Sequence, residues 1–523
     1  MAKILITDGM ATEGLDLLTA AGHQVDQRKV TAEELVGMIA EYDALVVRSA
    51  TQVTAAVLAA GSPKLKIVGR AGVGVDNVDV PTATGLGVIV MNAPLGNIIS
   101  AAEHTLAMVF ASARMVPQAH AKLITGVWDK KSFTGVELHG KTLGVIGLGK
   151  IGKHVSDVLR AAGMSIIAYD PFLSPEVAVE MRIEAVELDQ LLARADFVTV
   201  HTPLTDKTRN LINAERLGKM KPSARLVNVA RGGIIHEGDL AAALKAGTIA
   251  GAALDVFVNE PLEADSPLFG TPNLILTPHL GASTEEAQVK VSVDIANQFN
   301  VYFGEGRIVN AVNVNLRVDP AIDAYLRAAE QLGAALVQTL DSPLTGLEVT
   351  ARGDLAAYDT RPLAVAALKG ALAEISDQVV NFVNATAIAK DRGITLTSAS
   401  SEQQKGWSDQ LTIVASTAKG THTIGGAVVN GQLRVLRYDD FPIDLPIGGH
   451  LLIMEYPDRP GMVGAYGSLL GENHINIARM EVSRIDGRGD ALVILTLDDP
   501  IPPQVFDKIL ATVNPNRAYS ITI

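Results

Sequence analysis

Three polar residues, Arg231, Glu260 and His279, each stand shortly after an apolar run that predicts a buried strand. An imidazole has an ordinary pKa of about 6.5, so His279 suits proton transfer near neutral pH, and a carboxylate such as Glu260 would stabilise the imidazolium. The guanidinium of Arg231 can hold a carboxylate and polarise a carbonyl oxygen. These groups are what oxidation of a hydroxy acid by hydride transfer requires. Position alone assigns no role, because a histidine in a core or beside a site, as His104 and His201 could be, is often structural.

A glycine-rich loop could hold the hydride acceptor. Gly147-Leu-Gly149-Lys-Ile-Gly152 follows the predicted strand 142–146 and opens a predicted helix at 151–162. Glycine lets the backbone turn tightly and approach a pyrophosphate, which the N–H groups of the helix then face. Asp170 ends the next strand, where a carboxylate would bind ribose hydroxyls and repel a 2′-phosphate. We therefore expect NAD rather than NADP; the alternative is a plain strand-to-helix turn with Asp170 as a solvated carboxylate.

Two series of predicted strands must position these residues. The first series comprises Lys3–Thr7, Ala44–Arg48, Leu65–Gly69 and Val88–Met91. The second comprises Lys141–Ile146, Ser165–Tyr169, Asp196–Val200, Ala224–Val229, Gly251–Asp255 and Leu274–Thr277. Predicted helices include one with a capping box at Thr31–Glu34, one at Ser100–Arg114, and one from an N-cap at Ser283 to Phe303. This alternation predicts an α/β fold with two doubly wound parallel sheets, whose ligands bind beyond the carboxyl ends of the strands.

The pattern changes after residue 317. It predicts a strand at Leu347–Arg352, a helix from Pro362, and strands near Leu411 and Ala427. A hairpin turn is predicted at Asn430-Gly431. From His450 the order is β-α-β-β-α-β, with a turn at Asp486-Gly487. We expect an α+β domain followed by a ferredoxin-like domain.

The composition excludes several functions. With 523 residues, 48% hydrophobic and 19% charged, the chain is expected to form three or four domains. A net charge of −13 without a run of Lys or Arg argues against nucleic-acid binding. The lack of cysteine excludes disulfides and thiolate metal sites, and we expect no bound metal. No apolar run is long enough to predict a membrane span or a targeting segment, so we expect a cytoplasmic protein without membrane contacts.

The sequence resembles the D-isomer-specific 2-hydroxyacid dehydrogenases, in particular the long form of the D-3-phosphoglycerate dehydrogenase family. The motifs that carry the resemblance are Gly69-Arg-Ala-Gly-Val-Gly-Val-Asp-Asn77, Gly147 to Gly152, His201-Thr-Pro203, Asn228-Val-Ala-Arg-Gly-Gly233, Asp255-Val-Phe-Val-Asn-Glu-Pro261 and Pro278-His-Leu-Gly-Ala-Ser-Thr284. They extend through the catalytic half of the chain, and the predicted C-terminal elements continue the likeness to the end.

The resemblance implies roles for individual residues. The catalytic set would be Arg231, Glu260 and His279. The NAD site would be lined by Gly147, Gly149, Lys150, Ile151, Gly152, Asp170, His201, Thr202, Pro203, Val229, Ala230, Arg231, Asp255, His279, Gly281 and Ala282. The substrate would be held by Arg48, Arg70, Gly72 and Asn77. Surface salt bridges are the alternative for the two arginines.

The resemblance also implies a domain order and an activity. The expected domains are a discontinuous flavodoxin-like substrate-binding domain (1–97 and 288–316), a Rossmann domain (98–287), an intermediate allosteric substrate-binding domain (317–447) and an ACT domain (448–523). The chain would oxidise 3-phospho-D-glycerate to 3-phosphohydroxypyruvate with NAD, the first step of phosphorylated L-serine biosynthesis. We expect a homo-oligomer, either a tetramer or a dimer.

The C-terminal domain would sense an amino acid. Tyr456, Asp458 and Asn476 stand where ACT domains hold such a ligand, so L-serine is the expected feedback effector. The alternative is that Asp458-Arg-Pro-Gly461 merely starts a helix. Two rival activities also remain: a glyoxylate or hydroxypyruvate reductase with the same catalytic set, and an NAD-sensing binding protein of the co-repressor type.

Overall fold

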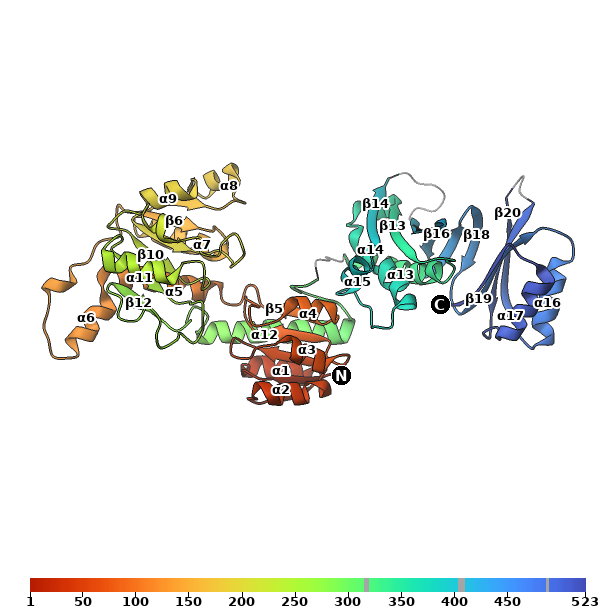
Figure 1. The fold of residues 1–523 in the computed structure, drawn as a ribbon, viewed down its shortest axis with the longest axis horizontal. Coiled ribbons are helices and arrows are strands. Elements are labelled where there is room, and N and C mark those ends of the chain that lie inside the picture. Colours follow the sequence, from red (N-terminus) through yellow and green to blue (C-terminus); the bar gives the residue numbers. More distant parts are fainter. Residues whose placement is uncertain (315–318, 403–409, 486–488) are drawn as a thin grey trace.

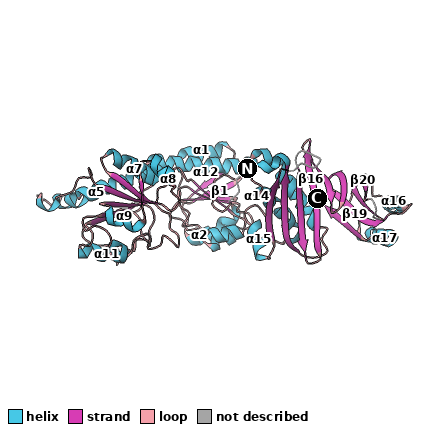
Figure 2. Ribbon diagram, turned by 90° about the horizontal axis from the view of Figure 1, so that it is seen from above, coloured by secondary structure: helices cyan, strands magenta, loops and turns pink. Residues whose placement is uncertain are grey.

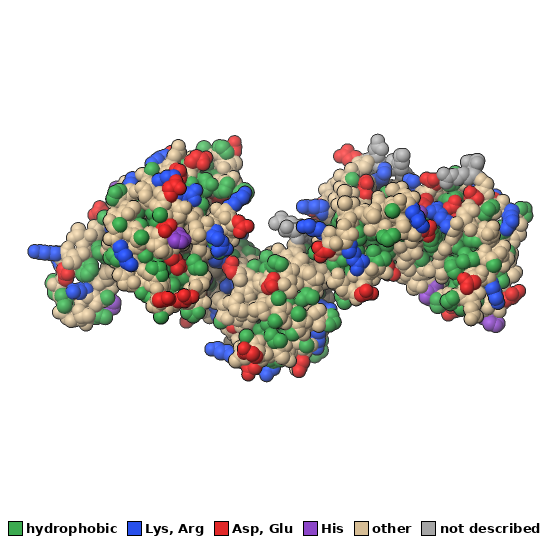
Figure 3. Space-filling model, in the orientation of Figure 1, with side chains coloured by type: hydrophobic (Ala, Val, Ile, Leu, Met, Phe, Trp, Pro, Cys, Tyr) green, Lys and Arg blue, Asp and Glu red, His purple; other side chains and the backbone are tan. Residues whose placement is uncertain are grey.

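The computed structural model describes residues 1–314, 319–402, 410–485 and 489–523. Figure 1 shows four sheets in a row along an elongated molecule, with the N-terminal sheet between the glycine-loop sheet and the two C-terminal sheets. Within the described ranges, no helix has both the length and the apolar character needed to cross a membrane. On the face drawn in Figure 3, basic and acidic side chains are interspersed over all the units.

The first sheet is parallel and has the order β2-β1-β3-β4-β5, as in flavodoxin-like folds. Its strands are β1 (Lys3–Ile6), β2 (Gln24–Gln27), β3 (Ala44–Val47), β4 (Ile67–Arg70) and β5 (Ile89–Asn92). Its helices are α1 (Thr12–Ala20), α2 (Ala32–Met38), α3 (Ala55–Gly61) and α4 (Val80–Gly85). The capping box at Thr31 and Glu34 is confirmed. Strand β2 escaped prediction because it is a short edge strand of mostly polar residues.

A helix from much later in the sequence completes this unit. Helix α12 (Glu285–Glu305) packs against α1, and the two lie side by side in Figure 2. Its buried residues Ile295 and Phe299 belong to the same apolar cluster as Ile4 of β1. The predicted N-cap was wrong by one residue: Thr284 rather than Ser283 accepts the N–H of the third helical residue.

The second sheet is also parallel and has the Rossmann order, β12-β11-β10-β9-β6-β7-β8. Its strands are β6 (Thr142–Ile146), β7 (Ser165–Tyr169), β8 (Glu184–Ala185), β9 (Phe197–Val200), β10 (Arg225–Asn228), β11 (Gly251–Leu254) and β12 (Leu274–Leu276). Its helices are α5 (Ile98–Arg114), α6 (Val116–Leu123), α7 (Lys150–Ala161), α8 (Pro175–Glu180), α9 (Leu188–Arg194), α10 (Ala214–Leu217) and α11 (Glu237–Ala246). The prediction of two doubly wound sheets is confirmed. Helix α6 projects from the end of the molecule in Figure 1.

The third sheet is mixed, with the order β14-β13-β15-β16-β17-β18. Its strands are β13 (Leu344–Arg352), β14 (Thr395–Ser401), β15 (Gln410–Thr417), β16 (Gly420–Val429), β17 (Gln432–Tyr438) and β18 (Phe441–Pro446). Its helices are α13 (Asp323–Val337), α14 (Arg361–Ile375) and α15 (Ala385–Asp391). The hairpin at Asn430-Gly431 is confirmed, and both residues have positive φ, as a tight hairpin turn requires.

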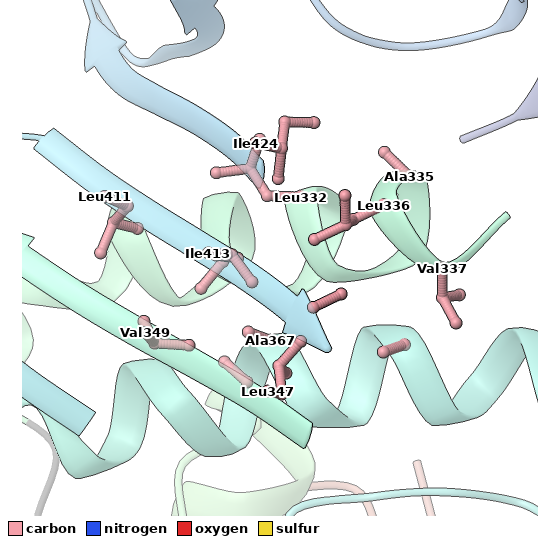
Figure 4. Packing of buried hydrophobic residues seen from close by; sticks show 14 of the residues in the cluster. Leu332, Ala335, Leu336, Val337, Leu347, Val349, Ala367, Leu411, Ile413 and Ile424 are labelled. Carbon is pink, nitrogen blue, oxygen red and sulfur yellow. The ribbon is translucent and has the colours of Figure 1, made fainter. Parts of the chain in front are cut away.

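Helices α13 and α14 cross very closely over this sheet. A Cβ atom added to Gly333 would lie 2.0 Å from the carbonyl oxygen of Ala367, and one on Gly370 would lie 1.9 Å from that of Glu330. Figure 4 shows how Leu332 and Leu336 of α13 face Leu347 and the other strand residues in the resulting core. The two glycines therefore set the spacing of the helix pair.

The fourth sheet is antiparallel, with the order β20-β21-β19-β22. Its elements are β19 (His450–Pro457), α16 (Met462–Glu472), β20 (Ile477–Arg484), β21 (Asp490–Leu497), α17 (Pro503–Val513) and β22 (Arg517–Thr522). This is the expected ferredoxin-like order; the turn expected at Asp486-Gly487 lies outside the described residues. Leu451, Ile453 and Ile494 of this unit belong to the same buried cluster as the core of the third sheet.

Candidate active site

The carboxyl ends of the second sheet's strands carry most of the candidate residues. Every strand of this sheet except the short β8 is directly followed by a candidate or neighbouring residue. These residues are Gly147 after β6, Asp170 after β7, His201 after β9, Val229 after β10, Asp255 after β11 and Thr277 after β12. Because all these strands are parallel, the six positions share one edge of the sheet. In doubly wound folds this edge is where a ligand binds.

The glycine loop leaves room for a dinucleotide. Gly147 has φ +89°, and a Cβ there would lie 2.8 Å from the carbonyl oxygen of His201. At Gly152 a Cβ would lie 2.4 Å from the carbonyl oxygen of Gly147, whereas one on Gly149 would meet no atom of the described chain within 4 Å. Helix α7 starts here with Lys150 and Ile151, and no side chain of the described residues caps its N-terminus. The open space and free N–H groups fit a pyrophosphate.

Asp170 closes over this loop. Its Oδ2 accepts the N–H of Leu148 at 2.8 Å, and its Oδ1 accepts the N–H of Phe172 at 2.9 Å. A cleft of roughly 340 Å³ lies beside it, lined by Leu148, Phe172, Val177 and Met181 among others. The carboxylate and an apolar cleft therefore stand together, as the adenosine end of a dinucleotide requires.

The segment after β9 forms the opposite wall of the glycine loop. Nε2 of His201 lies 3.0 Å from Oγ1 of Thr199, and burial lowers the pKa of His201 to about 4. Oγ1 of Thr202 is buried and lacks a hydrogen-bond partner in the part of the chain that the structure describes. The carbonyl of Pro203 accepts the hydroxyl of Thr208 at 2.7 Å. The unpartnered Thr202 hydroxyl fits a wall that a cofactor would cover.

Arg231 stands on a turn that a neighbouring asparagine builds. Asn228 accepts the N–H of Ala230 at 2.9 Å and donates to the carbonyl of Arg231 at 2.8 Å. The Arg231 side chain reaches the first unit, where its Nε lies 3.0 Å from Oδ2 of Asp76. The guanidinium therefore spans the boundary between the two doubly wound units.

Glu260 and His279 are in direct contact. Oε2 of Glu260 lies 2.6 Å from Nδ1 of His279, and Oε1 accepts the N–H of Phe257 at 3.0 Å. Burial raises the pKa of Glu260, but the bonds from His279 and Phe257 lower it more, so the net shift is downward. An ionised carboxylate only accepts, so Nδ1 carries the hydrogen and Nε2 of His279 is left as a proton acceptor.

The turn that carries His279 is fixed by Asp255. The Asp255 carboxylate is fully buried and accepts the N–H groups of Leu280 at 2.8 Å and Gly281 at 2.9 Å. The N–H of His279 donates to the carbonyl of Asp255 at 2.9 Å. Gly281 faces Val229, since an added Cβ would lie 3.1 Å from its Cγ1, and Ala282 next to it is half-buried.

Arginines of the first unit face Arg231. Burial and then repulsion from Arg231 lower the pKa of Arg70 to about 10, with Arg48 also contributing. Nε of Arg70 is buried and has no partner in the described ranges. Gly72 has φ +158°, and a Cβ there would lie 1.5 Å from Nη1 of Arg70. Neighbouring guanidiniums, one of them buried and incompletely paired, form a site for an anion.

Three further side chains, one predicted and two not, form hydrogen bonds to the backbone beside the arginines of the first unit. Asn77, expected to bind substrate, donates its amide to the carbonyls of Arg48 at 2.7 Å and Thr51 at 2.6 Å, so it braces the loop. Asp8, which was not predicted as a site residue, accepts the N–H groups of Arg48 and Thr51. Asn92 was not predicted either, and its amide donates to the carbonyl of Val73. Asp8 and Asn92 stand at or just past strand ends, a position that could have signalled them.

The three residues expected to bind an amino acid already have contacts within the protein. Tyr456 is 1% exposed, and its ring packs against Tyr466 in the core of the fourth unit. Asp458 forms a salt bridge with Arg484 at 3.0 Å, and the amide of Asn476 donates to Asp498 at 2.8 Å. Asp458 and Asn476 thus have protein partners, and the Tyr456 side chain is part of the core.

Profiles of three protein families match the chain. The D-isomer specific 2-hydroxyacid dehydrogenase NAD binding domain matches residues 106–281, the D-3-phosphoglycerate dehydrogenase intervening domain residues 321–437, and the ACT domain residues 450–514. The D-3-phosphoglycerate dehydrogenase of Synechocystis sp. is 46% identical, with 100% of this chain and 95% of that protein covered. The chain belongs to the D-3-phosphoglycerate dehydrogenase family. A second member, from Methanocaldococcus jannaschii, is 43% identical with 97% of each chain covered.

Solved structures of other dehydrogenases and reductases match part of this chain. A glyoxylate reductase from Paecilomyes thermophila is 27% identical with a TM-score of 0.54, covering 59% of this chain and 98% of that one. The NAD-dependent formate dehydrogenase of Staphylococcus aureus, solved with NAD, is 27% identical with a TM-score of 0.53, covering 59% and 97%. The resemblance read from the motifs is therefore confirmed.

Proposed function

We propose that the chain is an NAD-dependent dehydrogenase that oxidises 3-phospho-D-glycerate to 3-phosphohydroxypyruvate. The observation that carries the proposal is the contact of 2.6 Å between Glu260 and His279 at the sheet edge that also bears the glycine loop. The family supports the substrate, because relatives that span the whole chain are named D-3-phosphoglycerate dehydrogenases. Bound NAD would supply the hydride acceptor at this edge.

The residues of the chain divide the remaining work. His279 takes the hydroxyl proton at Nε2, while Glu260 holds Nδ1–H and stabilises the imidazolium. Arg231 orients the carboxylate and polarises the oxygen on which carbonyl character develops. The loop and wall described above hold the dinucleotide, and Asp170 favours NAD by repelling a 2′-phosphate.

A phosphorylated substrate fits the arginines of the first unit. A substrate with both a carboxylate and a phosphate carries more negative charge than one cation balances. Besides burial, repulsion from Arg231 and from Arg48 lowers the pKa of Arg70, and an anion bound beside these guanidiniums would relieve that repulsion. We assign the phosphate to the side of Arg48 and Arg70 and the carboxylate to Arg231.

The domain limits, the effector and the assembly follow as further parts of the proposal. Residues 1–97 with 288–316 would close on residues 98–287 and exclude water, while 317–447 and 448–523 would regulate. Nδ2 of Asn381 donates to the carbonyl of Gly87 at 2.7 Å, so the third unit touches the first.

L-serine near Asp458 would be the effector. The projecting α6 and exposed Trp128 and Ile124 support a homo-oligomer, and the protein would act in the cytoplasm.

The test follows NADH absorbance with NAD and three substrates: 3-phosphoglycerate, glycerate and lactate. We expect turnover with 3-phosphoglycerate. His279→Ala should lower kcat by orders of magnitude while NADH still binds, because it removes the base and leaves the glycine loop and Asp170 in place. Turnover of the unphosphorylated acids alone would favour a glyoxylate or hydroxypyruvate reductase. NADH binding without any turnover would favour the NAD-sensing protein.

A further inference from the structure

Helix α5 carries two side chains that contact the turn bearing His279. This helix leads from the first doubly wound unit into the second. Oγ of Ser100 donates to the carbonyl of Gly281 at 2.9 Å. His104 lies four residues further along α5, on the same face of the helix, and approaches the start of the same turn.

His104 touches two oxygen atoms. Its Nε2 lies 3.1 Å from Oδ1 of Asp255 and 3.1 Å from Oγ1 of Thr277. The Thr277 hydroxyl already donates to Oδ1 of Asp255 at 2.6 Å. A carboxylate has no hydrogen to offer, so neither neighbour can donate to Nε2, and Nε2 must carry the hydrogen itself. The imidazole is therefore a donor shared by the carboxylate and the hydroxyl.

The carboxylate that His104 meets is the anchor of the turn. Burial raises the pKa of Asp255, but hydrogen bonds from His104, Thr277 and the N–H of Leu280 outweigh it and lower the pKa overall. Asp255 therefore stays ionised although it is fully buried. A buried charge of this kind persists only when its acceptor sites are filled by donors.

His279 itself has a backbone that needs such an anchor. Its φ is +54°, in the left-handed region that residues other than glycine seldom adopt. Hydrogen bonds to Asp255 hold His279 and the two residues after it, through the N–H groups of His279, Leu280 and Gly281. Any shift of Asp255 would thus move the imidazole relative to Glu260.

We infer that His104 is a positioning residue for the reaction: its Nε2–H ties Asp255 and Thr277 to helix α5 and so keeps His279 aimed at the substrate. The inference rests on the proposed function, because it concerns the orientation of the proposed base. His104 acts through Asp255 and touches no reacting atom. Because α5 also connects the two doubly wound units, the contact made by His104 links the turn that bears His279 to the relative position of those units.

The test compares His104→Leu, which removes the donor, with His104→Gln, whose amide can still donate. We expect His104→Leu to lower kcat/KM for 3-phosphoglycerate at least about tenfold, the loss set by one charge-assisted hydrogen bond. It should also shift the acid limb of the kcat/KM pH profile. His104→Gln should stay within about threefold of the wild type. His139→Leu, at an exposed position outside the helices and strands, removes an imidazole elsewhere and should match the wild type.

A second measurement does not depend on turnover. Hydrogen exchange of peptides covering residues 277–282 should accelerate in His104→Leu and stay slow in His104→Gln. If His104→Leu fails to fold, His104→Met, whose longer side chain also lacks a donor, should show the same two effects. Wild-type kinetics and exchange in His104→Leu, or equal losses in the Leu and Gln variants, would overturn the inference. Absence of turnover in the wild type would instead overturn the proposed function and leave the exchange result to decide on His104.

Discussion

Gly74 controls the position of Arg231, and its replacement by alanine should damage catalysis without damaging the fold. A Cβ on Gly74 would lie 2.0 Å from Nη2 of Arg231 and 2.7 Å from Oδ2 of Asp76. Ordinary van der Waals contact starts at 3.4 Å, so the guanidinium must move by about 1.4 Å. It is the end of a flexible side chain, so the cost to the free energy of unfolding should stay under about 1 kcal/mol. A misplacement of about 1 Å in an orienting group can cost up to about 100-fold in rate.

We therefore expect Gly74→Ala to lower kcat/KM for 3-phosphoglycerate by about 10- to 100-fold, or about 1.4 to 2.7 kcal/mol of transition-state stabilisation. The assay is NADH absorbance, with urea unfolding measured on the same preparations. Gly37→Ala on α2 is the matched control, because a Cβ there meets no atom within 4 Å in the part of the chain that the structure describes. Wild-type kcat/KM in Gly74→Ala, or an equal loss in Gly37→Ala, would refute the role given to Arg231.

Three further predictions follow from single contacts. Gly333→Ala forces a Cβ to 2.0 Å from a backbone oxygen and should destabilise the chain by about 1–3 kcal/mol in urea unfolding, whereas Gly464→Ala, with open space around it, should not. Asp170→Asn removes the charge that opposes a 2′-phosphate and should narrow the NAD-over-NADP preference about tenfold in kcat/KM; an unchanged ratio would contradict the assignment. Burial lowers the pKa of His201 to about 4, below the ordinary value of about 6.5. Between these two pH values the His201 imidazole binds a proton in the unfolded chain but not in the folded chain. The free energy of unfolding therefore falls as the pH drops from about 6.5 to 4. His201→Gln should flatten this part of the stability profile, and an equally steep profile would argue against it.

The sequence sufficed for the arrangement of the sheets because that arrangement follows local rules, and the same rules mark the candidate site residues. Strands, glycine turns and the polar residues after strands repeat in a pattern that parallel sheets convert into a shared edge. Asp170, Glu260 and His279 were predicted as site residues in this way. The ligand that each would contact came from the family resemblance rather than from spacing.

The remaining contacts depend on distances in space that the sequence does not encode locally. Arg231 meets Asp76 across 155 positions of sequence, and although Asp76 lies in the motif Gly69 to Asn77, the motif does not identify Arg231 as its partner. Ser283 and Thr284 are both residue types that are favoured at an N-cap. Thr284 takes this position because the folded helix begins at Glu285. Tyr456 was assigned to a ligand site from its motif, but its place on β19 turns the ring into the core.

The buried cluster shared by the third and fourth sheets has a practical consequence for shortening the chain. A cut after residue 447 would leave the neighbours of Leu451, Ile453 and Ile494 facing water. The shortened protein would present a new apolar surface and be prone to associate or lose solubility. Loss of an effector response after such a cut would therefore reflect the exposed surface as much as a missing ligand, and point substitutions around Asp458 are the cleaner way to separate the two.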